Sequence, residues 1–343
     1  MHAAAISYAT APLLTTYTRA MSKLLPGLCL AVALTTPLAI GSCASASDGA
    51  AASDGELQSG TFTRTRYPIV LAHGLTGFRQ LFGVVDYFNG IPGDLQSGGA
   101  KVFVTQVSAV ASAEQRGEQL LQQIEFIAAS TGAGKVNLIG HSEGGLDARY
   151  VMGVRPDLIA SLTTVATPHL GAELADFLAD NLTPGGFNET VLAALGNSLG
   201  TIIDLLTGIP SPQDALGAVQ SLSSAGAAVF NQKFPAGLAA TRCGATPSSA
   251  GGIPLYSWAG SSVLTNFLDI SDPALGIASL FYSEPSDGLV GRCSGHFGKV
   301  VRDSFSMNHL DEVNQLFGLT SIFETSPVAV FRSHANRLKN AGL

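Results

Sequence analysis

Charged residues are scarce in this chain of 343 residues. Lysine, arginine, aspartate and glutamate together make up 13% of it, and no run of like charges appears. The formal net charge is −7 at pH 7. Phosphate binding needs a basic stripe, so nucleic acid is excluded as a partner, and acidic or basic tails are excluded as well. The apolar share of 46% is ordinary for a globular protein and too high for a disordered one.

A long apolar run lies near the N-terminus. It follows Lys23 and ends in small residues, an order that is typical of a secretory signal. We expect residues 1–46 to be a signal peptide, with Met21 as a candidate true start and cleavage after Ala46. The protein is then secreted and extracellular. Acylation at Cys43, which would give an outer-membrane lipoprotein, is the alternative.

Cysteine is also scarce, with four in the whole chain, two of them in the signal region. The mature chain keeps Cys243 and Cys293, an even pair in an oxidising compartment. We expect a disulfide between them, which is worth about 2–4 kcal/mol in the chain-entropy model because it closes a long loop. Two buried thiols are the alternative.

Internal repeats are absent, and after a small polar linker over residues 47–60 the chain alternates between strand-like and helical stretches. YPIVLAHG and KVNLIG are typical of buried strands, whereas RGEQLLQQIEFIAAS has the spacing of an amphipathic helix. This alternation predicts one α/β domain over residues 61–343, with a mostly parallel sheet and helices on both faces. Such sheets bind ligands at the carboxyl ends of their strands.

The segment over residues 185–206 departs from this alternation. It is rich in leucine, isoleucine and valine and has only two charges. Polar groups are too few for an ordinary surface helix. The segment is either a core helix or a mobile flap with an apolar underside.

Ser142 lies at the centre of a Gly-x-Ser-x-Gly motif. Glycine is so frequent, at 39 residues, that the motif alone is weak evidence. Its context is more specific, because a predicted strand ends at Gly140 and a predicted helix opens at Gly144. A strand–serine–helix turn presents a nucleophilic serine. A serine that only caps the helix is the alternative.

A serine nucleophile needs a base and an orienting acid, and in this architecture the acid precedes the histidine along the chain. His309, between a strand-like stretch and a helix, is the preferred base, with His296 as second candidate. Asp287, in a Pro-Ser-Asp-Gly turn, is the preferred acid, with Asp269 and Asp272 as rivals.

Two backbone N–H groups must stabilise the oxyanion of such a reaction. One belongs to Glu143, directly after the nucleophile, and the other to the early loop AHGLTGF, where Leu75 is the candidate donor. His73 in this loop is predicted to be structural. A carboxylate pointing at the oxyanion would oppose it, so we expect the Glu143 side chain to point elsewhere, toward Arg149 or another cation.

The motifs YPIVLAHGLTGF, KVNLIGHSEGG, SDGLVGRC and MNHLDEVNQLFGLTS together resemble those of the secreted bacterial triacylglycerol lipases of the Pseudomonas and Burkholderia type. The resemblance runs from about Tyr67 to the C-terminus. It implies an α/β-hydrolase fold with a helical lid. It also implies a triad of Ser142, Asp287 and His309, oxyanion donors at Leu75 and Glu143, a Cys243–Cys293 disulfide, and a lid at about residues 185–206.

The same resemblance implies a structural calcium site. The matching positions are Asp269 and Asp311 as carboxylate ligands, with Gln315 and Leu319 giving carbonyl oxygens. Because Asp311 is two residues from His309, a bound calcium ion would fasten the loop that presents the base. The resemblance also implies a dedicated membrane-anchored folding chaperone and a two-step secretion route.

Taken together, these features predict a secreted, monomeric lipase that hydrolyses triacylglycerol esters at lipid–water interfaces through an acyl-enzyme. A short-chain carboxylesterase or thioesterase without interfacial activation is the nearest alternative, and the apolar segment over 185–206 argues against it. A binding module on an inactive hydrolase fold is disfavoured because every triad candidate is present.

Overall fold

The computed structural model describes residues 60–343, apart from residues 76, 78–79, 82–84, 110 and 182–214. A seven-stranded sheet has the strand order β4-β1-β5-β6-β8-β7, with β9 also paired to β8. The strands are β1 (Ile69–Ala72), β4 (Val102–Val104), β5 (Val136–His141), β6 (Ile159–Val165), β7 (Ser249–Ala250), β8 (Ile253–Gly260) and β9 (Lys299–Phe305). All pairs are parallel except the short β7–β8 pair.

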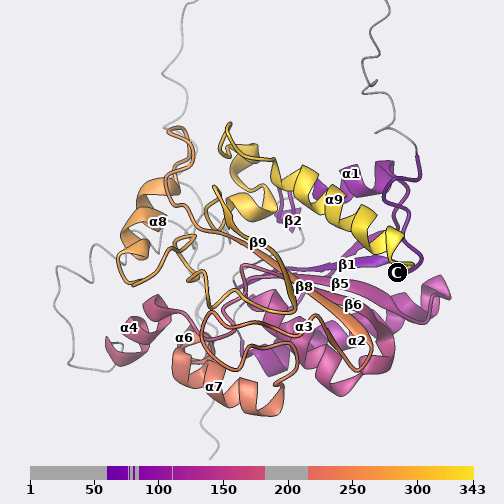
Figure 1. The fold of residues 1–343 in the computed structure, drawn as a ribbon, viewed down its shortest axis with the longest axis horizontal. Helices are drawn as coiled ribbons and strands as arrows, with labels where there is room; N and C mark the ends of the chain where they lie inside the picture. Colours follow the sequence, from indigo (N-terminus) through magenta and orange to yellow (C-terminus); the bar gives the residue numbers. More distant parts are fainter. Residues whose placement is uncertain (1–59, 76, 78–79, 82–84, 110, 182–214) are drawn as a thin grey trace, which may run out of the picture. The chain divides into compact units, whose positions relative to one another are not determined.

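The two faces of the sheet bury two separate core clusters. Alternate residues of β1 belong to different clusters, as a pleated strand requires. One cluster is closed by α1 (Ile91–Ser97) and α9 (Pro327–Asn340), and the other by α2 (Ala113–Thr131) and α3 (Glu143–Val154). Figure 1 shows these helix pairs on opposite faces of the sheet.

Local sequence explains why α2 begins and ends where it does. The Ser112 side chain caps it by accepting a hydrogen bond from the N–H of Gln115. Gly132 ends it at φ 66°, in the left-handed region that glycine adopts without strain. Between these ends, Leu120 and Ile124 repeat at helical spacing and are buried. The capping residues and the buried stripe therefore define the same helix, α2.

Most of the remaining elements follow the carboxyl ends of the strands, whereas the 3₁₀ turn η2 (Pro156–Leu158) directly precedes β6. The backbone N–H of Arg66 donates to the carbonyl of the C-terminal residue Leu343, so β1 starts beside the C-terminus. Figure 1 shows α4, α6 and α8 toward the opposite end of the sheet. These elements are α4 (Glu173–Asn181), α6 (Ala215–Leu222), α7 (Ser224–Lys233), α8 (Asp272–Ser279), the hairpin of β2 (Gln80–Leu81) and β3 (Val85–Asp86), and the 3₁₀ turns η3 (Asp311–Val313) and η4 (Leu316–Gly318).

The predicted fold class is confirmed: the sheet is mostly parallel and has helices on both faces. The helix predicted to open at Gly144 corresponds to α3, which begins one residue earlier at Glu143. The predicted signal peptide (1–46), nearly all of the linker (47–60) and the predicted lid (185–206) lie outside the described residues. In the described part of the chain, no helix is long and apolar enough to cross a membrane.

Candidate active site

Ser142 occupies the sharp turn between β5 and α3. Its backbone angles are φ 56° and ψ −131°, and a positive φ is uncommon for a residue with a side chain. Two glycines make the turn possible. A Cβ on Gly140 would lie 2.2 Å from the carbonyl oxygen of Gly144, and a Cβ on Gly144 would lie 2.5 Å from that of Ala72. The Ser142 hydroxyl makes no capping bond to α3, so it does not serve as a helix cap.

His309 and Asp287 form a buried pair. Nδ1 of His309 lies 2.8 Å from Oδ2 of Asp287, and the His309 N–H donates to the Asp287 carbonyl at 2.9 Å. The other carboxylate oxygen accepts the N–H groups of Leu289 at 2.9 Å and Val290 at 2.7 Å. Both carboxylate oxygens of Asp287 are therefore hydrogen-bonded. The carboxylate orients the His309 imidazole so that Nε2 points away from Asp287.

His141, directly before Ser142, connects the parts of the site. Its ring lies 4.7 Å from that of His309, and its Nε2 is 3.1 Å from the His309 carbonyl oxygen. Its Nδ1 is 2.7 Å from the hydroxyl of Tyr87, which accepts the N–H of Gly74 at 3.1 Å. With the Tyr87 hydroxyl donating to Nδ1, Nε2 carries the proton and donates to His309. One hydrogen-bonded chain thus joins the early loop, the Ser142 turn and His309.

The early loop that follows β1 lies against the Ser142 turn. A Cβ on Gly74 would lie 2.7 Å from Cβ of Ser142, and Leu75, the candidate oxyanion donor, comes next. His73 Nδ1 is 3.0 Å from the Gly74 carbonyl oxygen, and its Nε2 accepts the N–H of Val107 at 3.2 Å. Burial lowers the pKa of His73 to about 3. A neutral ring with both nitrogens occupied fits the predicted structural role.

The side chain of the fully buried Glu143 points toward a cation, as predicted, and of the two alternatives this is another cation, Arg116 of α2, and not Arg149. Nε of Arg116 lies 3.3 Å from Oε2 of Glu143 and 3.0 Å from Oδ2 of Asp147, one turn further along α3. Burial raises the pKa of Glu143 to about 8 and that of Asp147 to about 6, while Arg116 opposes both shifts. The larger shift falls on Glu143, so Asp147 is the carboxylate that balances the guanidinium, and the protonated form of Glu143 is favoured.

Helix geometry explains why Arg149 is not the cation that Glu143 faces. Arg149 lies six positions after Glu143, and at about 100° per residue the two side chains leave α3 in different directions. The Arg149 guanidinium contacts Nδ1 of His169 at 3.2 Å and donates to Oδ1 of Asn231 at 2.8 Å and to the Phe234 carbonyl. Burial lowers its pKa to about 9.

The second candidate histidine, His296, and the rival acid Asp272 are engaged elsewhere, and so is another downstream histidine, His334. Nε2 of His296 lies 2.8 Å from Oδ2 of Asp303 on β9. His334 is buried, with Nε2 2.8 Å from the Thr163 hydroxyl, and burial lowers its pKa to about 3. Asp272 accepts backbone hydrogen bonds from the loop before α8. These contacts leave His309 as the histidine that is paired with Asp287.

The predicted carboxylate ligands of calcium meet around Asn308. Its side-chain amide donates to Oδ2 of Asp269 at 3.1 Å, and its backbone N–H donates to Oδ2 of Asp311 at 3.1 Å. Burial raises the pKa of Asp311 to about 7, and the charges of Asp269 and Asp272 add to the rise. A bound cation would reduce the repulsion between these buried carboxylates. Calcium prefers oxygen ligands, so these residues fit calcium.

The two predicted carbonyl ligands follow on the same loop. Gln315 precedes η4, and Leu319 ends it. The carbonyl of Thr320, next to Leu319, accepts the side-chain amide of Asn266 at 3.0 Å. Asn266 belongs to the loop that carries Asp269, so all four predicted ligands lie on two loops that are in contact.

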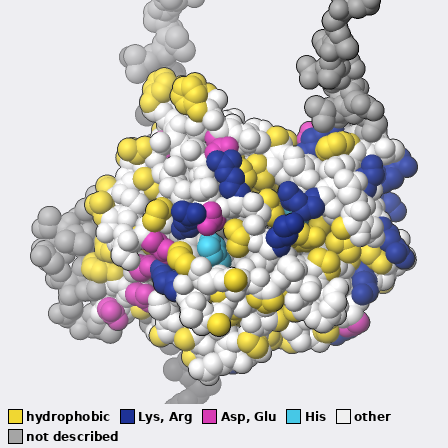
Figure 2. All heavy atoms as spheres, in the orientation of Figure 1, with side chains coloured by type: hydrophobic (Ala, Val, Ile, Leu, Met, Phe, Trp, Pro, Cys, Tyr) yellow, Lys and Arg dark blue, Asp and Glu magenta, His cyan; other side chains and the backbone are white. Residues whose placement is uncertain are grey.

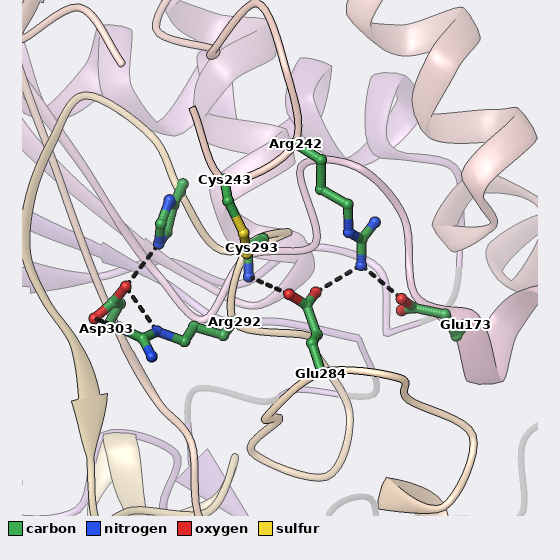
Figure 3. The surroundings of a disulfide bond; sticks show 8 residues. Glu173, Arg242, Cys243, Glu284, Arg292, Cys293 and Asp303 are labelled. Carbon is green, nitrogen blue, oxygen red and sulfur yellow. Dashed lines mark hydrogen bonds and ion pairs between the residues drawn. A yellow bond between two sulfur atoms is a disulfide. The ribbon is translucent and has the colours of Figure 1, made fainter. Parts of the chain in front are cut away.

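The predicted disulfide between Cys243 and Cys293 is confirmed. Figure 3 shows it beside Glu284, whose Oε2 accepts the Cys293 N–H at 3.2 Å. Arg242 lies between Glu284 and Glu173, 2.6 Å from a carboxylate oxygen of each. Because Glu173 opens α4, the disulfide and these ion pairs connect the loop before β9 to α4.

Sequence reasoning did not identify three polar residues of the site: Arg116, Tyr87 and His141. The sequence held a signal for the first. Arg116, Leu120 and Ile124 are four residues apart and share the buried stripe of α2. A charge on an apolar stripe has to find a buried partner. Its partners come from other segments, which periodicity does not reveal.

The family model described as the alpha/beta hydrolase fold matches residues 67–291 of the chain. The matched region includes β1, the Ser142 turn and Asp287. The parallel sheet and the serine turn at the end of its central strand agree with this match. The chain therefore belongs to the α/β-hydrolase family.

Within that family the chain is a member of the bacterial triacylglycerol lipases. It is 51% identical to the triacylglycerol lipase of Vibrio cholerae serotype O1 over 283 residues, 82% of this chain and 90% of that one. It is 43% identical to the triacylglycerol lipase of Burkholderia plantarii over 331 residues, 85% and 91% of the two chains. Among solved structures, Staphylococcus hyicus lipase gives a TM-score of 0.54 at 18% identity, covering 81% of this chain and 97% of that one. This last likeness concerns the fold alone.

Proposed function

We propose that this chain is a secreted lipase that hydrolyses ester bonds of triacylglycerols at lipid–water interfaces. The observation that carries the proposal is the Ser142 turn beside the His309–Asp287 pair. Ser142 has a left-handed φ of 56°, and His309 lies 2.8 Å from Asp287. Relatives with more than 40% identity over most of the chain, named triacylglycerol lipase, support the substrate class.

In the proposed reaction, the Ser142 hydroxyl oxygen attacks the ester carbonyl carbon while Nε2 of His309 takes its proton. The N–H groups of Leu75 and Glu143 stabilise the oxyanion that forms. The C–O bond to glycerol then breaks, and the leaving alcohol takes the proton from His309. Water repeats the sequence on the acyl-enzyme and releases a fatty acid. Asp287 keeps the imidazole oriented and stabilises its charged form.

Exposed apolar side chains near α8 support action at a lipid surface. Phe267 is 95% exposed and Phe323 is 94% exposed, and their two loops are joined by the Asn266–Thr320 hydrogen bond. Neighbouring exposed residues are Leu264, Leu268, Ile270, Leu280, Phe317 and Ile322. Figure 2 shows hydrophobic side chains on the part of the surface that carries α8. Large exposed apolar patches mark interaction or membrane surfaces.

The proposal includes a structural calcium ion held by Asp269, Asp311, Gln315 and Leu319. The supporting observation is the crowding of buried carboxylates around Asn308. When bound, calcium would supply a positive charge that holds two loops together, one of which presents His309. Secretion is proposed as well, because a Cys243–Cys293 disulfide is typical of an oxidising compartment.

Labelling with a p-nitrophenyl alkylphosphonate tests the enzyme hypothesis. Wild-type protein should gain one phosphonyl group on Ser142, detected by mass spectrometry of the peptide. Ser142→Ala should not be labelled, whereas the control Ser326→Ala, which removes the cap of α9, should be labelled like wild type. Failure of the wild-type protein to react would remove the enzyme hypothesis.

A second comparison separates a lipase from a short-chain esterase. We expect a rate on emulsified triolein that exceeds the rate on soluble butyrate ester. Phe267→Ser with Phe323→Ser should lower the first rate and leave the second unchanged. Phe126→Ser provides the control, because Phe126 is 73% exposed on α2, away from these loops. Equal losses on both substrates would contradict the interfacial role.

A further inference from the structure

We propose that Arg116 is a positioning residue that orients both peptide groups of the oxyanion hole through a single guanidinium. This inference rests on the proposed function, since it concerns the geometry of the two proposed N–H donors. Arg116 lies on α2 and is fully buried. Its contacts reach the early loop after β1 and the first turns of α3. These are the two segments that carry Leu75 and Glu143.

On the early loop, the contact acts on the peptide group of the donor itself. Nη2 of Arg116 donates to the carbonyl of His73 at 2.8 Å and to that of Gly74 at 3.2 Å. The Gly74 carbonyl and the Leu75 N–H belong to one planar peptide, and no described peptide bond is cis. In a trans peptide these two groups point in opposite directions. Holding the carbonyl against Arg116 therefore aims the Leu75 N–H to the opposite side.

Other donors share the Gly74 carbonyl and make its position definite. The Gly77 N–H donates to it at 3.1 Å, and Nδ1 of His73 lies 3.0 Å from it. Gly74 itself is in contact with the Ser142 turn, where a Cβ would come within 2.7 Å of the serine Cβ. Among these three donors the guanidinium is the one that carries a full charge, and its contact of 3.2 Å is slightly longer than the other two.

On α3, Arg116 is hydrogen-bonded to Asp147, one turn after Glu143, and it is also in contact with the side chain of Glu143, the residue that carries the second donor. Its Nε lies 3.3 Å from Oε2 of Glu143 and 3.0 Å from Oδ2 of Asp147. The peptide between Ser142 and Glu143 is fixed from its other side, because the Ser142 carbonyl accepts the Gly145 N–H at 3.0 Å. The same guanidinium thus sets the distance between the early loop and the start of α3.

The geometry requires arginine in particular. Its planar fork has five N–H donors, and here they serve carbonyls of the early loop, the Ser108 carbonyl and the carboxylates of α3. A lysine ammonium has its donors on one atom and cannot reach all three segments. The carboxylate of Asp147 balances the charge of the guanidinium, which makes its burial possible.

Arg116→Lys tests this role by steady-state kinetics on soluble butyrate ester. Misplacement of a catalytic group by about 1 Å costs roughly 100-fold in rate, and loss of an oxyanion donor costs about 100- to 1000-fold. We expect kcat to fall by roughly 10- to 100-fold while KM changes by less than about 3-fold, since the oxyanion forms only in the transition state. The rate of Ser142 phosphonylation should fall by the same factor.

Arg149→Lys is the matched control. Arg149 is also a buried arginine, lies on α3 and contacts His169 and Asn231 in place of the early loop. It should lower the melting temperature as much as Arg116→Lys and leave kcat within about 3-fold of wild type. A purely structural role for Arg116 would make the two variants alike in kcat, and that result would overturn the proposal.

A second variant covers the case in which a buried lysine prevents folding. Arg116→Gln combined with Asp147→Asn removes both charges and keeps a polar side chain at each position. It should show the same fall in kcat at unchanged KM. Failure of both variants to fold would assign Arg116 to stability and overturn the proposal. If the wild-type protein itself is not phosphonylated, the proposed function is wrong. If the wild-type protein reacts and Arg116→Lys behaves like Arg149→Lys, only the proposed role of Arg116 is wrong.

Discussion

The protonation state of Glu143 gives a quantitative prediction for Glu143→Gln. The side chain is fully buried, and neither of its carboxyl oxygens has a hydrogen-bond partner in the described part of the chain. Arg116 is already engaged by Asp147. Burial raises the pKa of Glu143 to about 8 from an ordinary value of 4.5. In the pH range between these values the folded protein keeps a proton that the unfolded chain releases.

The sign of the stability effect follows from this difference. A raised carboxyl pKa means that the stability linked to the group is fully present below pH 4.5 and is lost as the pH rises to about 8. One proton corresponds to roughly 1.4 kcal/mol per pH unit within this window. Glutamine has the same shape and no proton to release. Glu143→Gln should therefore gain stability relative to wild type as the pH rises.

Urea unfolding at pH 5, 6, 7 and 8 measures the effect. The difference in unfolding free energy between Glu143→Gln and wild type should grow in favour of the variant by roughly 1.4 kcal/mol per pH unit. Groups that titrate alike in both proteins cancel in this difference. Glu125→Gln makes the same substitution at an exposed glutamate on α2 and serves as the control. A difference that is constant from pH 5 to 8 would refute a neutral Glu143.

The same reasoning makes a prediction for activity. At neutral pH a protonated Glu143 places no negative charge beside the developing oxyanion, so Glu143→Gln should keep kcat near the wild-type value. Above pH 8 the wild-type carboxyl ionises and opposes the oxyanion, whereas glutamine does not. The ratio of variant to wild-type kcat should therefore rise between pH 7 and 9.5.

Three further predictions concern the site and its supports. Ser142→Ala should lower hydrolysis to background, measured by titration of released fatty acid. EDTA and Asp269→Ala should each lower the melting temperature, and EDTA should have no further effect on the Asp269→Ala variant. An unchanged melting curve in both experiments would count against a calcium site. Asp157→Ala, at an exposed carboxylate, is the control. Cys243→Ser with Cys293→Ser removes a bridge between residues 50 apart, so the free energy of unfolding should fall by about 4 kcal/mol; a loss below 1 kcal/mol would show that the unfolded chain is already compact.

The fold was predictable because its signals are local. Buried parallel strands are short apolar runs, and α2 has a capping serine, a helical apolar stripe and a terminal glycine within one continuous stretch. The same holds for Ser142, whose neighbours Gly140 and Gly144 are needed to avoid clashes with backbone atoms. A motif that depends on steric exclusion is visible in sequence because other residues cannot replace glycine there.

The charged interior was not predictable in the same way. Arg116 and the Gly74 carbonyl are 42 residues apart in sequence, and Arg116 and Asp147 are 31 apart. Such pairs exist only after α2 has packed against α3 and the end of β1. The sequence predicted that Glu143 would point toward a cation, Arg149 or another, but it did not single out Arg116. Arg149 is near Glu143 in sequence, and the rotation of the helix separates their side chains.

The site contains a second histidine next to a carboxyl group, and the geometry decides against it as a catalytic pair. Oε2 of Glu312 lies 3.9 Å from Nε2 of His141, and both groups are buried beside His309. Nε2 of His141 is already bound to the His309 carbonyl, and Nδ1 is bound to Tyr87. Burial lowers the pKa of His141 and raises that of Glu312, and both shifts favour the neutral forms. A histidine with both nitrogens occupied cannot take the serine proton, whereas Asp287 uses only Nδ1 of His309 and leaves Nε2 for it.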